Sequence, residues 1–234
     1  MNDISETDAV ILAGGLGTRL QKVVSDRPKV LAQVAGRPFL TYLLSQLEGT
    51  GFRRVVLCTG HLGDQVESAF GDEYGSLCLE YSRESRPLGT GGALRLALPL
   101  INSQTILVAN GDSYCGAKLG ALFEFHKRRG AQSTILLTDV DDVSRYGCVR
   151  TDAGGAVLGF DEKNSEGGPG WINAGVYVIE RNLLAKIPPD ESISLERDLF
   201  PSWIGRGFHG FEGPGRFLDI GTEESFAAAQ SFFK

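Results

Sequence analysis

The chain has 234 residues and a mass of 25.2 kDa, which is enough for one domain with a sizeable core. Its net charge of −6 and pI near 5.2 argue against a protein that binds nucleic acid or anionic membranes over a general surface. The polar, acidic N-terminus is unlike a signal peptide and no apolar run is long enough to span a membrane, so we expect a cytoplasmic protein.

The first half of the chain alternates strand-like and helix-like segments. Short apolar runs predict buried strands at residues 8–12, 54–59, 77–81 and 105–109. Pro38 stands where a helix can begin, apolar residues follow at helical spacing over residues 39–47, and Gly49 and Gly51 close the run. Further helices are expected over residues 61–70 and 91–98. This alternation builds crossover units, and therefore a mostly parallel sheet with helices on both faces. Because ligands on such sheets bind beyond the carboxyl ends of the strands, we expect the segments after these strands to meet at one rim.

The second half of the chain begins with a predicted helix over residues 118–129 and a strand over 133–138. Short strands and glycines follow from Arg145 onward. A short helix over residues 194–201 is expected to stop at Pro201. Thr222 is a fair N-cap with acidic residues after it, which predicts a terminal helix.

The most informative stretch follows the first strand. Residues 10–20 read Val-Ile-Leu-Ala-Gly-Gly-Leu-Gly-Thr-Arg-Leu, and Arg27-Pro28-Lys29 comes shortly after. Glycines let backbone N–H groups cradle a phosphate, while Arg19 can grip its oxygens with a planar fork and Lys29 supplies a point charge. The spacing excludes a Walker loop, and Leu20 stands where a dinucleotide fingerprint needs its third glycine. On spacing alone, an ordinary glycine-rich turn with surface cations explains the stretch equally well.

A carboxylate follows the predicted strand over residues 105–109. Asp112 ends the tripeptide Asn110-Gly111-Asp112, directly beyond a buried parallel strand and therefore on the expected ligand rim. Carboxylate oxygens suit Mg²⁺, which takes one or two carboxylates together with substrate phosphates. The alternative is an aspartate in an ordinary turn, which is frequent.

Together these segments resemble a known enzyme family. The run from Ala13 to Leu20, with Arg27-Pro28-Lys29 behind it, is similar to the signature of the sugar-phosphate nucleotidyltransferases, which make nucleotide sugars. Three later segments match the family in the same order: Tyr146-Gly147, Glu162-Lys163 and Asn173-Ala174-Gly175. The resemblance covers residues 8 to about 226 and has one departure, Gln21-Lys22-Val23-Val24, where many relatives carry Pro-Leu-Thr.

This resemblance implies a fold and a domain organisation. The fold is α/β, a Rossmann-like three-layer α/β/α arrangement with a mixed, mostly parallel central sheet. We expect a single domain over residues 1–234. Its nucleotide-binding half would span about residues 8–115, and its sugar-phosphate-binding half about residues 116–234.

The resemblance also implies roles for individual residues. Catalysis would use Arg19, Lys29 and Asp112, and Asp112 and Asp219 would hold the cofactor, Mg²⁺. The nucleotide would contact Leu12, Gly14, Gly15, Gly17, Thr18, Leu88, Gly89, Gly92 and Gly111. The sugar phosphate would contact Gly147, Glu162, Lys163, Asn173 and Gly175, with Lys163 on the phosphate.

The implied reaction transfers a nucleotidyl group from a nucleoside triphosphate to a sugar 1-phosphate and releases pyrophosphate. The attacking phosphate has a second pKa of about 6 and is largely deprotonated at neutral pH, which explains why no catalytic base is needed. Residues 87–94, residues 194–198 and the compact length look most like the D-glycero-α-D-manno-heptose 1-phosphate guanylyltransferases, which make GDP-heptose from GTP for capsule or surface-layer glycans.

Other hypotheses stay open at this point. The chain is also compatible with a mannose 1-phosphate guanylyltransferase, or with a sugar 1-phosphate uridylyl- or thymidylyltransferase of similar size. A different class is an inactive regulatory subunit that binds nucleotide sugars. The sequence leaves open whether two copies pair as a homodimer.

Overall fold

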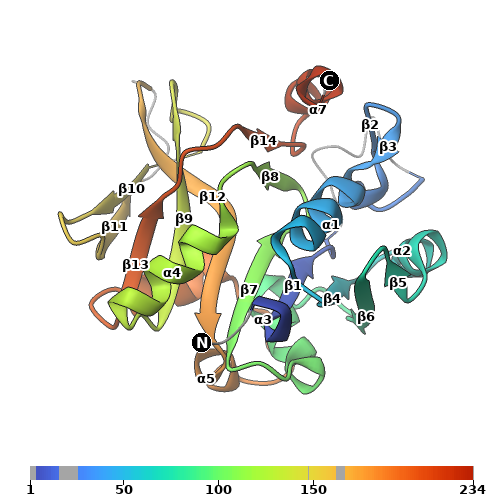
Figure 1. The fold of residues 1–234 in the computed structure, drawn as a ribbon, viewed down its shortest axis with the longest axis horizontal. Helices are drawn as coiled ribbons and strands as arrows, with labels where there is room; N and C mark the ends of the chain where they lie inside the picture. Colours follow the sequence, from blue (N-terminus) through green and yellow to red (C-terminus); the bar gives the residue numbers. More distant parts are fainter. Residues whose placement is uncertain (1–3, 16–25, 147, 162–166, 234) are drawn as a thin grey trace.

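An eight-stranded mixed sheet forms the centre of the molecule in the computed structural model, which describes residues 4–15, 26–146, 148–161 and 167–233 (Figure 1). Its order is β13-β9-β12-β7-β1-β4-β6-β5. The bounds are β1 (Asp8–Leu12), β4 (Arg54–Thr59), β5 (Glu73–Tyr74), β6 (Leu77–Arg83), β7 (Thr105–Asn110), β9 (Ser133–Val140), β12 (Gly170–Glu180) and β13 (Phe208–Glu212). β1 pairs in parallel with β4 and β7, β4 with β6, and β13 with β9, whereas β12 is antiparallel to both of its neighbours. The predicted mixed, mostly parallel sheet is confirmed.

Helices cover both faces of this sheet, because each buried strand presents side chains to both sides. Along β1, Ala9 and Ile11 belong to one core cluster and Val10 to the other. The first cluster is covered by α1 (Phe39–Thr50), α4 (Leu119–Arg129) and α7 (Glu223–Phe232). The second is covered by α3 (Gly89–Ala97), α5 (Arg181–Ala185) and α6 (Phe200–Trp203). The molecule therefore has the three layers that the family resemblance implies.

Small elements complete the rim at the carboxyl ends of the parallel strands. β8 (Ser113–Cys115) follows β7 directly and pairs with β14 (Phe217–Asp219), which leads into α7. The other pairs are β2 (Gln33–Val34) with β3 (Arg37–Pro38), and β10 (Cys148–Thr151) with β11 (Val157–Asp161). Helix α2 (Gly63–Phe70) lies between β4 and β5 in the chain. Within the described ranges, no helix is both long and apolar enough to cross a bilayer.

Local sequence signals set several of the helix boundaries. α1 begins after Pro38, and its last turn is closed by Gly51, whose φ of 106° favours glycine. α7 begins at Thr222, which accepts from the Ser225 N–H in a capping box. Both boundaries confirm the sequence prediction.

The prediction that the helix over residues 194–201 stops at Pro201 is wrong. A π-helical turn (Leu195–Leu199) continues directly into α6, and Pro201 lies in the first turn of that helix. A proline in a first turn removes an N–H that has no partner within the helix, so the chain can stay helical there.

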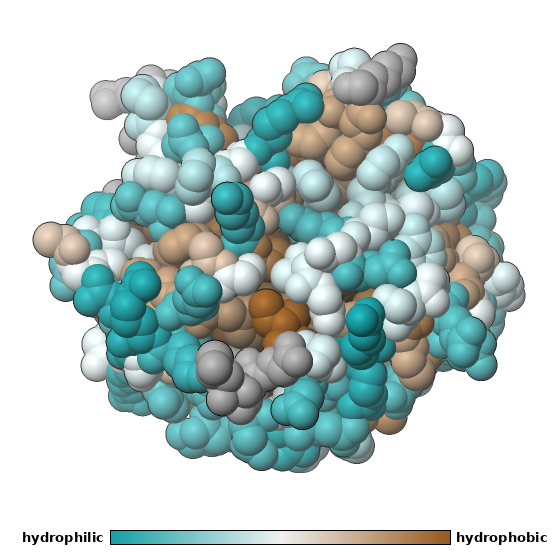
Figure 2. Space-filling view, viewed as in Figure 1, coloured by the Kyte–Doolittle hydropathy of each residue, from teal (hydrophilic) through white to brown (hydrophobic). Residues whose placement is uncertain are grey.

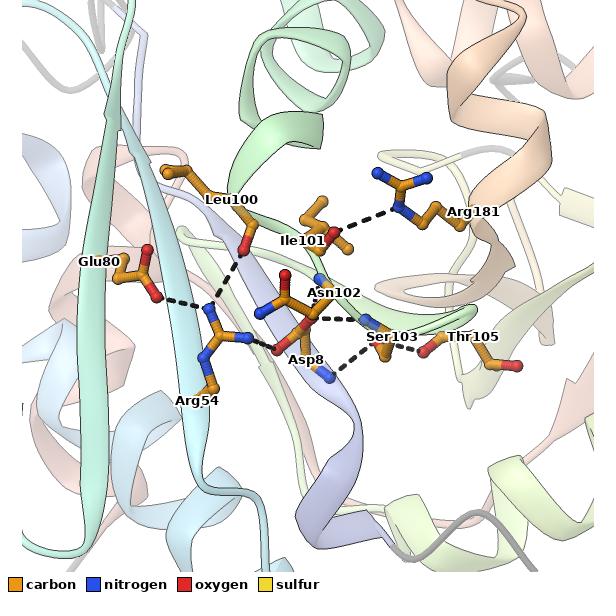
Figure 3. A network of polar contacts seen from close by, with 9 residues as sticks. All are labelled: Asp8, Arg54, Glu80, Leu100, Ile101, Asn102, Ser103, Thr105 and Arg181. Atoms are coloured by element: carbon orange, nitrogen blue, oxygen red, sulfur yellow. Dashed lines mark hydrogen bonds and ion pairs between the residues drawn. The ribbon is translucent and has the colours of Figure 1, made fainter.

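A buried carboxylate clamps the amino ends of the central strands, on the opposite side from the rim (Figure 3). The side chain of Asp8 is 2% exposed. It accepts from the Arg54 guanidinium at 2.8 Å and from the backbone N–H groups of Asn102 and Ser103 at 2.6 and 2.8 Å. Arg54 also pairs with Glu80, so this cluster joins β1, β4, β6 and the segment that enters β7.

We predict that Asp8→Ala lowers the free energy of unfolding by about 2–3 kcal/mol, because two backbone N–H groups and a guanidinium lose their acceptor. Urea denaturation followed by circular dichroism measures this change. Asp64→Ala is the matched control, since Asp64 is 82% exposed in its ion pair with Arg83 and should contribute less than about 1 kcal/mol. Equal effects of the two substitutions would contradict the proposed clamp.

Candidate active site

Two cavities open at the rim and share Asn110, Asp112 and Gly221. The first has a volume of about 380 Å³ and the second about 540 Å³. β7 runs upward in Figure 1 to β8, and the outline of the molecule is indented at its upper edge in Figure 2, between the ends of β9 and β12 and helix α7. Asp112 therefore lies where the two cavities meet.

Lys29 is paired with Asp112 at this junction. Lys29 begins a short 3₁₀ turn (Lys29–Leu31) after Pro28, and its Nζ lies 2.7 Å from Asp112 Oδ2. The Lys29 side chain is 15% exposed and is therefore largely shielded from water, whereas the Asp112 side chain is 41% exposed. The structure therefore brings together two predicted catalytic residues that are 83 positions apart in the chain.

Asp219 comes to the same rim through strand pairing. It is the last residue of β14 and lies opposite Ser113 of β8, while the Ile220 N–H donates to the Asp112 carbonyl at 2.9 Å. Asp219 Oδ1 accepts from the Gly221 N–H at 2.8 Å, and both aspartates line the second cavity. The two predicted metal ligands therefore converge.

Tyr146 holds the other oxygen of Asp219. Its hydroxyl donates to Asp219 Oδ2 at 2.8 Å. Burial, followed by this hydrogen bond to a carboxylate, raises the pKa of Tyr146 to about 12. The phenol therefore stays protonated at neutral pH and orients the carboxylate as a hydrogen-bond donor.

The donor set at the junction fits a hard divalent cation. Asp112 Oδ1 receives no hydrogen bond from the described residues, and the buried Oδ1 of Asn110 has no partner among them either. No group of three or more His, Cys, Asp or Glu side chains suitable for a metal occurs in the described part of the chain. Two carboxylates are nevertheless a sufficient protein contribution for Mg²⁺, which retains waters and substrate oxygens.

The glycine-rich turn forms one wall of the first cavity, which Leu12, Gly14, Gly15 and Gly111 all line. The Gly111 N–H donates to the Leu12 carbonyl at 2.9 Å, and a Cβ at Gly111 would lie 2.7 Å from that oxygen. Glycine at 111 is therefore needed for the close approach of β7 to the turn after β1. Gly15 adopts a φ of 109°, which L side chains avoid.

Three of the predicted nucleotide-binding residues, Leu88, Gly89 and Gly92, also have a structural role. Leu88 is buried, and a Cβ at Gly92 would lie 2.4 Å from the Glu191 carbonyl oxygen. A Cβ at Gly89 would likewise lie 2.5 Å from the Ile193 carbonyl oxygen. Gly89 and Gly92 therefore let the segment before the π-helical turn pack against the start of α3. The contacts of Leu88, Gly89 and Gly92 with a nucleotide stay predictions.

A hydrogen-bonded chain that the sequence prediction missed links the two cavities. Glu196 lines the first cavity and accepts from the Thr90 hydroxyl at 3.0 Å and from the buried Tyr177 hydroxyl at 3.3 Å. Asn173, which lines the second cavity, donates in turn to Tyr177 at 2.9 Å. The family resemblance includes Glu196 only as part of residues 194–198, and no local pattern indicates that Thr90, 106 positions away, contacts it.

The second cavity contains two of the predicted sugar-phosphate residues, Asn173 and Gly175. Asn173 Oδ1 accepts from the Gly175 N–H at 2.8 Å, which fixes the amide where the pairing of β12 with β9 shifts register. A Cβ at Gly175 would lie 2.4 Å from Ser113 Oγ. The other predicted site residues lie outside the described residues: Gly17, Thr18, Arg19, Gly147, Glu162 and Lys163.

We predict that Gly92→Ala lowers the free energy of unfolding by roughly 1–3 kcal/mol, because its methyl group must displace the backbone at Glu191. Chemical denaturation measures the effect. Gly49→Ala is the matched control: Gly49 lies in α1 with nothing within 4 Å, so alanine should stabilise the helix by up to about 1 kcal/mol. A Gly92→Ala protein as stable as the parent would contradict this packing.

Comparisons with known proteins agree with this geometry. The model of the nucleotidyl transferase family matches residues 8–234. The chain is 39% identical to mannose-1-phosphate guanylyltransferase of Mycobacterium tuberculosis, over 94% of this chain and 63% of that protein, so it spans somewhat less than two thirds of that relative. It is 36% identical to D-glycero-α-D-manno-heptose 1-phosphate guanylyltransferase of Aneurinibacillus thermoaerophilus, over 95% of this chain and 96% of that one.

A solved structure is similar over its whole length. HddC from Yersinia pseudotuberculosis superposes with a TM-score of 0.86 at 35% identity, covering 97% of this chain and 100% of HddC, and it has also been solved in complex with GMP-PN. The family match and these relatives lead to one conclusion. The chain belongs to the nucleotidyl transferase family.

Proposed function

We propose that the protein transfers a guanylyl group from GTP to a sugar 1-phosphate, releasing pyrophosphate, and that D-glycero-α-D-manno-heptose 1-phosphate is its preferred acceptor. The observation that carries the proposal is the junction itself: two cavities share Asp112, and Lys29 is paired with it there. A triphosphate in the first cavity and a sugar phosphate in the second would bring their reacting phosphates together at this point.

The two cavities suit these two ligands by their chemistry. Backbone groups of the glycine-rich turn and the Lys29 ammonium line the first, which fits a polyphosphate. The second is lined by Asn173, Ser144, Tyr146 and Arg145, whose polar and cationic character fits a hydroxylated, phosphorylated sugar. Because the sugar phosphate is already largely ionised at neutral pH, positioning and charge neutralisation would carry most of the catalysis.

Asp112 and Asp219 would hold Mg²⁺ in this proposal. The ion would supply neutralisation of charge on the substrate phosphates. Lys29 would exchange its contact with Asp112 for a contact with the triphosphate, since its Nζ already lies at the wall of the first cavity. Tyr146 would keep the Asp219 carboxylate oriented by its donated hydrogen bond.

Similarity in sequence supports the heptose acceptor. The Aneurinibacillus heptose 1-phosphate enzyme is 36% identical to this chain over 95% of it, and residues 87–94 and 194–198 resemble the same group of enzymes. Mannose 1-phosphate guanylyltransferase is the second candidate, because the mycobacterial relative has the higher identity, 39%. A role in capsule biosynthesis in the cytoplasm would follow from the heptose acceptor.

Release of pyrophosphate tests the proposal across a matrix of triphosphates and sugar 1-phosphates. With the heptose acceptor, we expect the rate of pyrophosphate release with GTP to exceed the rates with ATP, CTP, UTP and dTTP by about tenfold or more. The reason is that a mismatched base leaves buried donors or acceptors unpaired, at a cost of roughly 1–3 kcal/mol each. Mannose 1-phosphate should react more slowly than the heptose, and glucose 1-phosphate more slowly still. Nucleotide binding without pyrophosphate release from any pair would instead support the regulatory subunit.

We predict that Asp112→Asn and Asp219→Asn each lower kcat by about a hundredfold or more at saturating Mg²⁺, because loss of a metal contact removes several kcal/mol of charge stabilisation. Steady-state kinetics over a range of Mg²⁺ concentrations measure kcat and the metal requirement, and a chelator should abolish turnover of the parent. Asp72→Asn, on an exposed turn, is the matched control and should behave as the parent does. Full turnover in both active-site variants would exclude the two-carboxylate site.

A further inference from the structure

Helix α7 begins close to Asp219, which ends β14 and is one of the two proposed metal ligands (Figure 1). Ile220, Gly221 and the N-cap residue Thr222 are the three residues between Asp219 and the helix. This short connection places the capping box of α7 against the Asp219 carboxylate, so that Ser225 Oγ lies 3.2 Å from Asp219 Oδ1. Ser225 is 8% exposed, and the contact is therefore largely shielded from water.

The groups around the capping box decide where the Ser225 hydroxyl proton points. The Thr222 hydroxyl oxygen accepts from the Ser225 N–H at 3.2 Å and from the Arg145 guanidinium at 3.0 Å, and both of these groups can only donate. With two donors on its oxygen, the Thr222 hydroxyl gives its own proton to Ser225 Oγ, 3.0 Å away. The Ser225 proton is then free for Asp219, because a carboxylate is a stronger acceptor than the Thr222 carbonyl, which already accepts from the Phe226 N–H at 2.9 Å.

Three donors hold the Asp219 carboxylate in one orientation. Oδ1 accepts from the Gly221 N–H at 2.8 Å as well as from Ser225, and Oδ2 accepts from the Tyr146 hydroxyl at 2.8 Å. A carboxylate offers about four acceptor sites. The donors that reach Asp219 from the described residues therefore leave one of these sites open, on Oδ2. One open oxygen site is enough for Mg²⁺, which retains several waters and takes one or two carboxylates.

The surroundings of Oδ1 make its position sensitive to each contact. A Cβ at Gly221 would lie 2.8 Å from Asp219 Oδ1 and 3.6 Å from Lys29 Nζ, so a larger residue there would displace the carboxylate. Without the Ser225 hydroxyl, Oδ1 would keep one donor from the described residues, the Gly221 N–H, and the carboxylate could turn about that single bond.

We propose that Ser225 is a positioning residue for Asp219, whose Oδ1 it holds so that Oδ2 stays available to the cation. This inference rests on the Mg²⁺ site proposed for Asp112 and Asp219, and it specifies what orients one of the two ligands. The capping box then has two tasks, because Thr222 accepts from the first turn of α7 while Ser225 donates to the carboxylate. Removing a hydrogen bond that orients a metal ligand typically weakens metal binding by about 10–100-fold.

Binding of Mn²⁺, followed by electron paramagnetic resonance, tests the assignment without any reaction. For Ser225→Ala we expect Mn²⁺ to bind about tenfold more weakly than to the parent protein. Thr222→Ala is the matched control, since it removes the oxygen that caps the helix but leaves the Ser225 hydroxyl able to donate to Asp219. We therefore expect Thr222→Ala to keep most of the parent affinity for Mn²⁺.

Thermal unfolding shows whether Ser225 acts only through the stability of α7. Both Ser225→Ala and Thr222→Ala should lower the Tm, because both break the capping box. Ser231→Ala, at an exposed position near the end of the same helix, should change neither the Tm nor the affinity for Mn²⁺. If Thr222→Ala weakened Mn²⁺ binding as much as Ser225→Ala, the role of Ser225 would be helix capping alone, and the proposal would be overturned.

Asp219→Asn separates this inference from the proposed function. If Asp219→Asn binds Mn²⁺ as the parent does, or if the parent binds none, the proposed metal site fails and the role of Ser225 fails with it. If Asp219→Asn loses Mn²⁺ while Ser225→Ala keeps the parent affinity, the metal site stands and the role of Ser225 fails. If the affinities follow the predicted order but the parent catalyses no guanylyl transfer, the proposed function fails and the role of Ser225 stands.

Discussion

The ion pair between Lys29 and Asp112, 2.7 Å long, is the contact around which the rim is organised. It joins the segment after β1 to the segment after β7, two neighbouring parallel strands whose carboxyl ends necessarily meet at one edge. The Gly111 N–H reinforces this approach through its bond to the Leu12 carbonyl. From Asp112 the chain continues into β8, and the pairing of β8 with β14 carries Asp219 to the same place. One contact between two charged groups thus marks the point where both cavities begin.

A charged pair of this kind is well suited to exchange partners. Lys29 is largely buried while Asp112 keeps two-fifths of its side chain exposed, so the carboxylate is accessible from both cavities. An ammonium and a carboxylate that neutralise each other in the free protein can each turn to a phosphate or a cation when these are supplied. The hydrogen-bonded chain from Glu196 through the buried Tyr177 to Asn173 connects the walls of the two cavities.

Regular elements were predictable because their signals are local. The apolar run at Asp8–Leu12 is β1 with the same bounds, and Pro38, Gly51 and Thr222 mark the helix ends as expected. Family resemblance also placed Lys29, Asp112 and Asp219 in one site. The parallel pairing of β1 with β7 explains why Lys29 and Asp112 converge, and the antiparallel pairing of β14 with β8 brings Asp219 to them. The Thr90–Glu196 contact and the Asp8 clamp could not be predicted, since each depends on side chains from segments far apart in the chain. Pro201 shows the limit of a local rule: its effect depends on where the helix begins, and the preceding π turn sets that point.

The central claim is that the nucleotide and the sugar occupy different cavities and meet at Asp112. A crystal structure of the protein with its nucleotide-sugar product tests this most directly. The account predicts the nucleotide in the cavity lined by Gly14 and Gly15, the diphosphate between Lys29 and Asp112, and the sugar against Asn173 and Tyr146. A product whose base lies in the cavity of Asn173, or whose diphosphate makes no contact with Lys29 or Asp112, would contradict it.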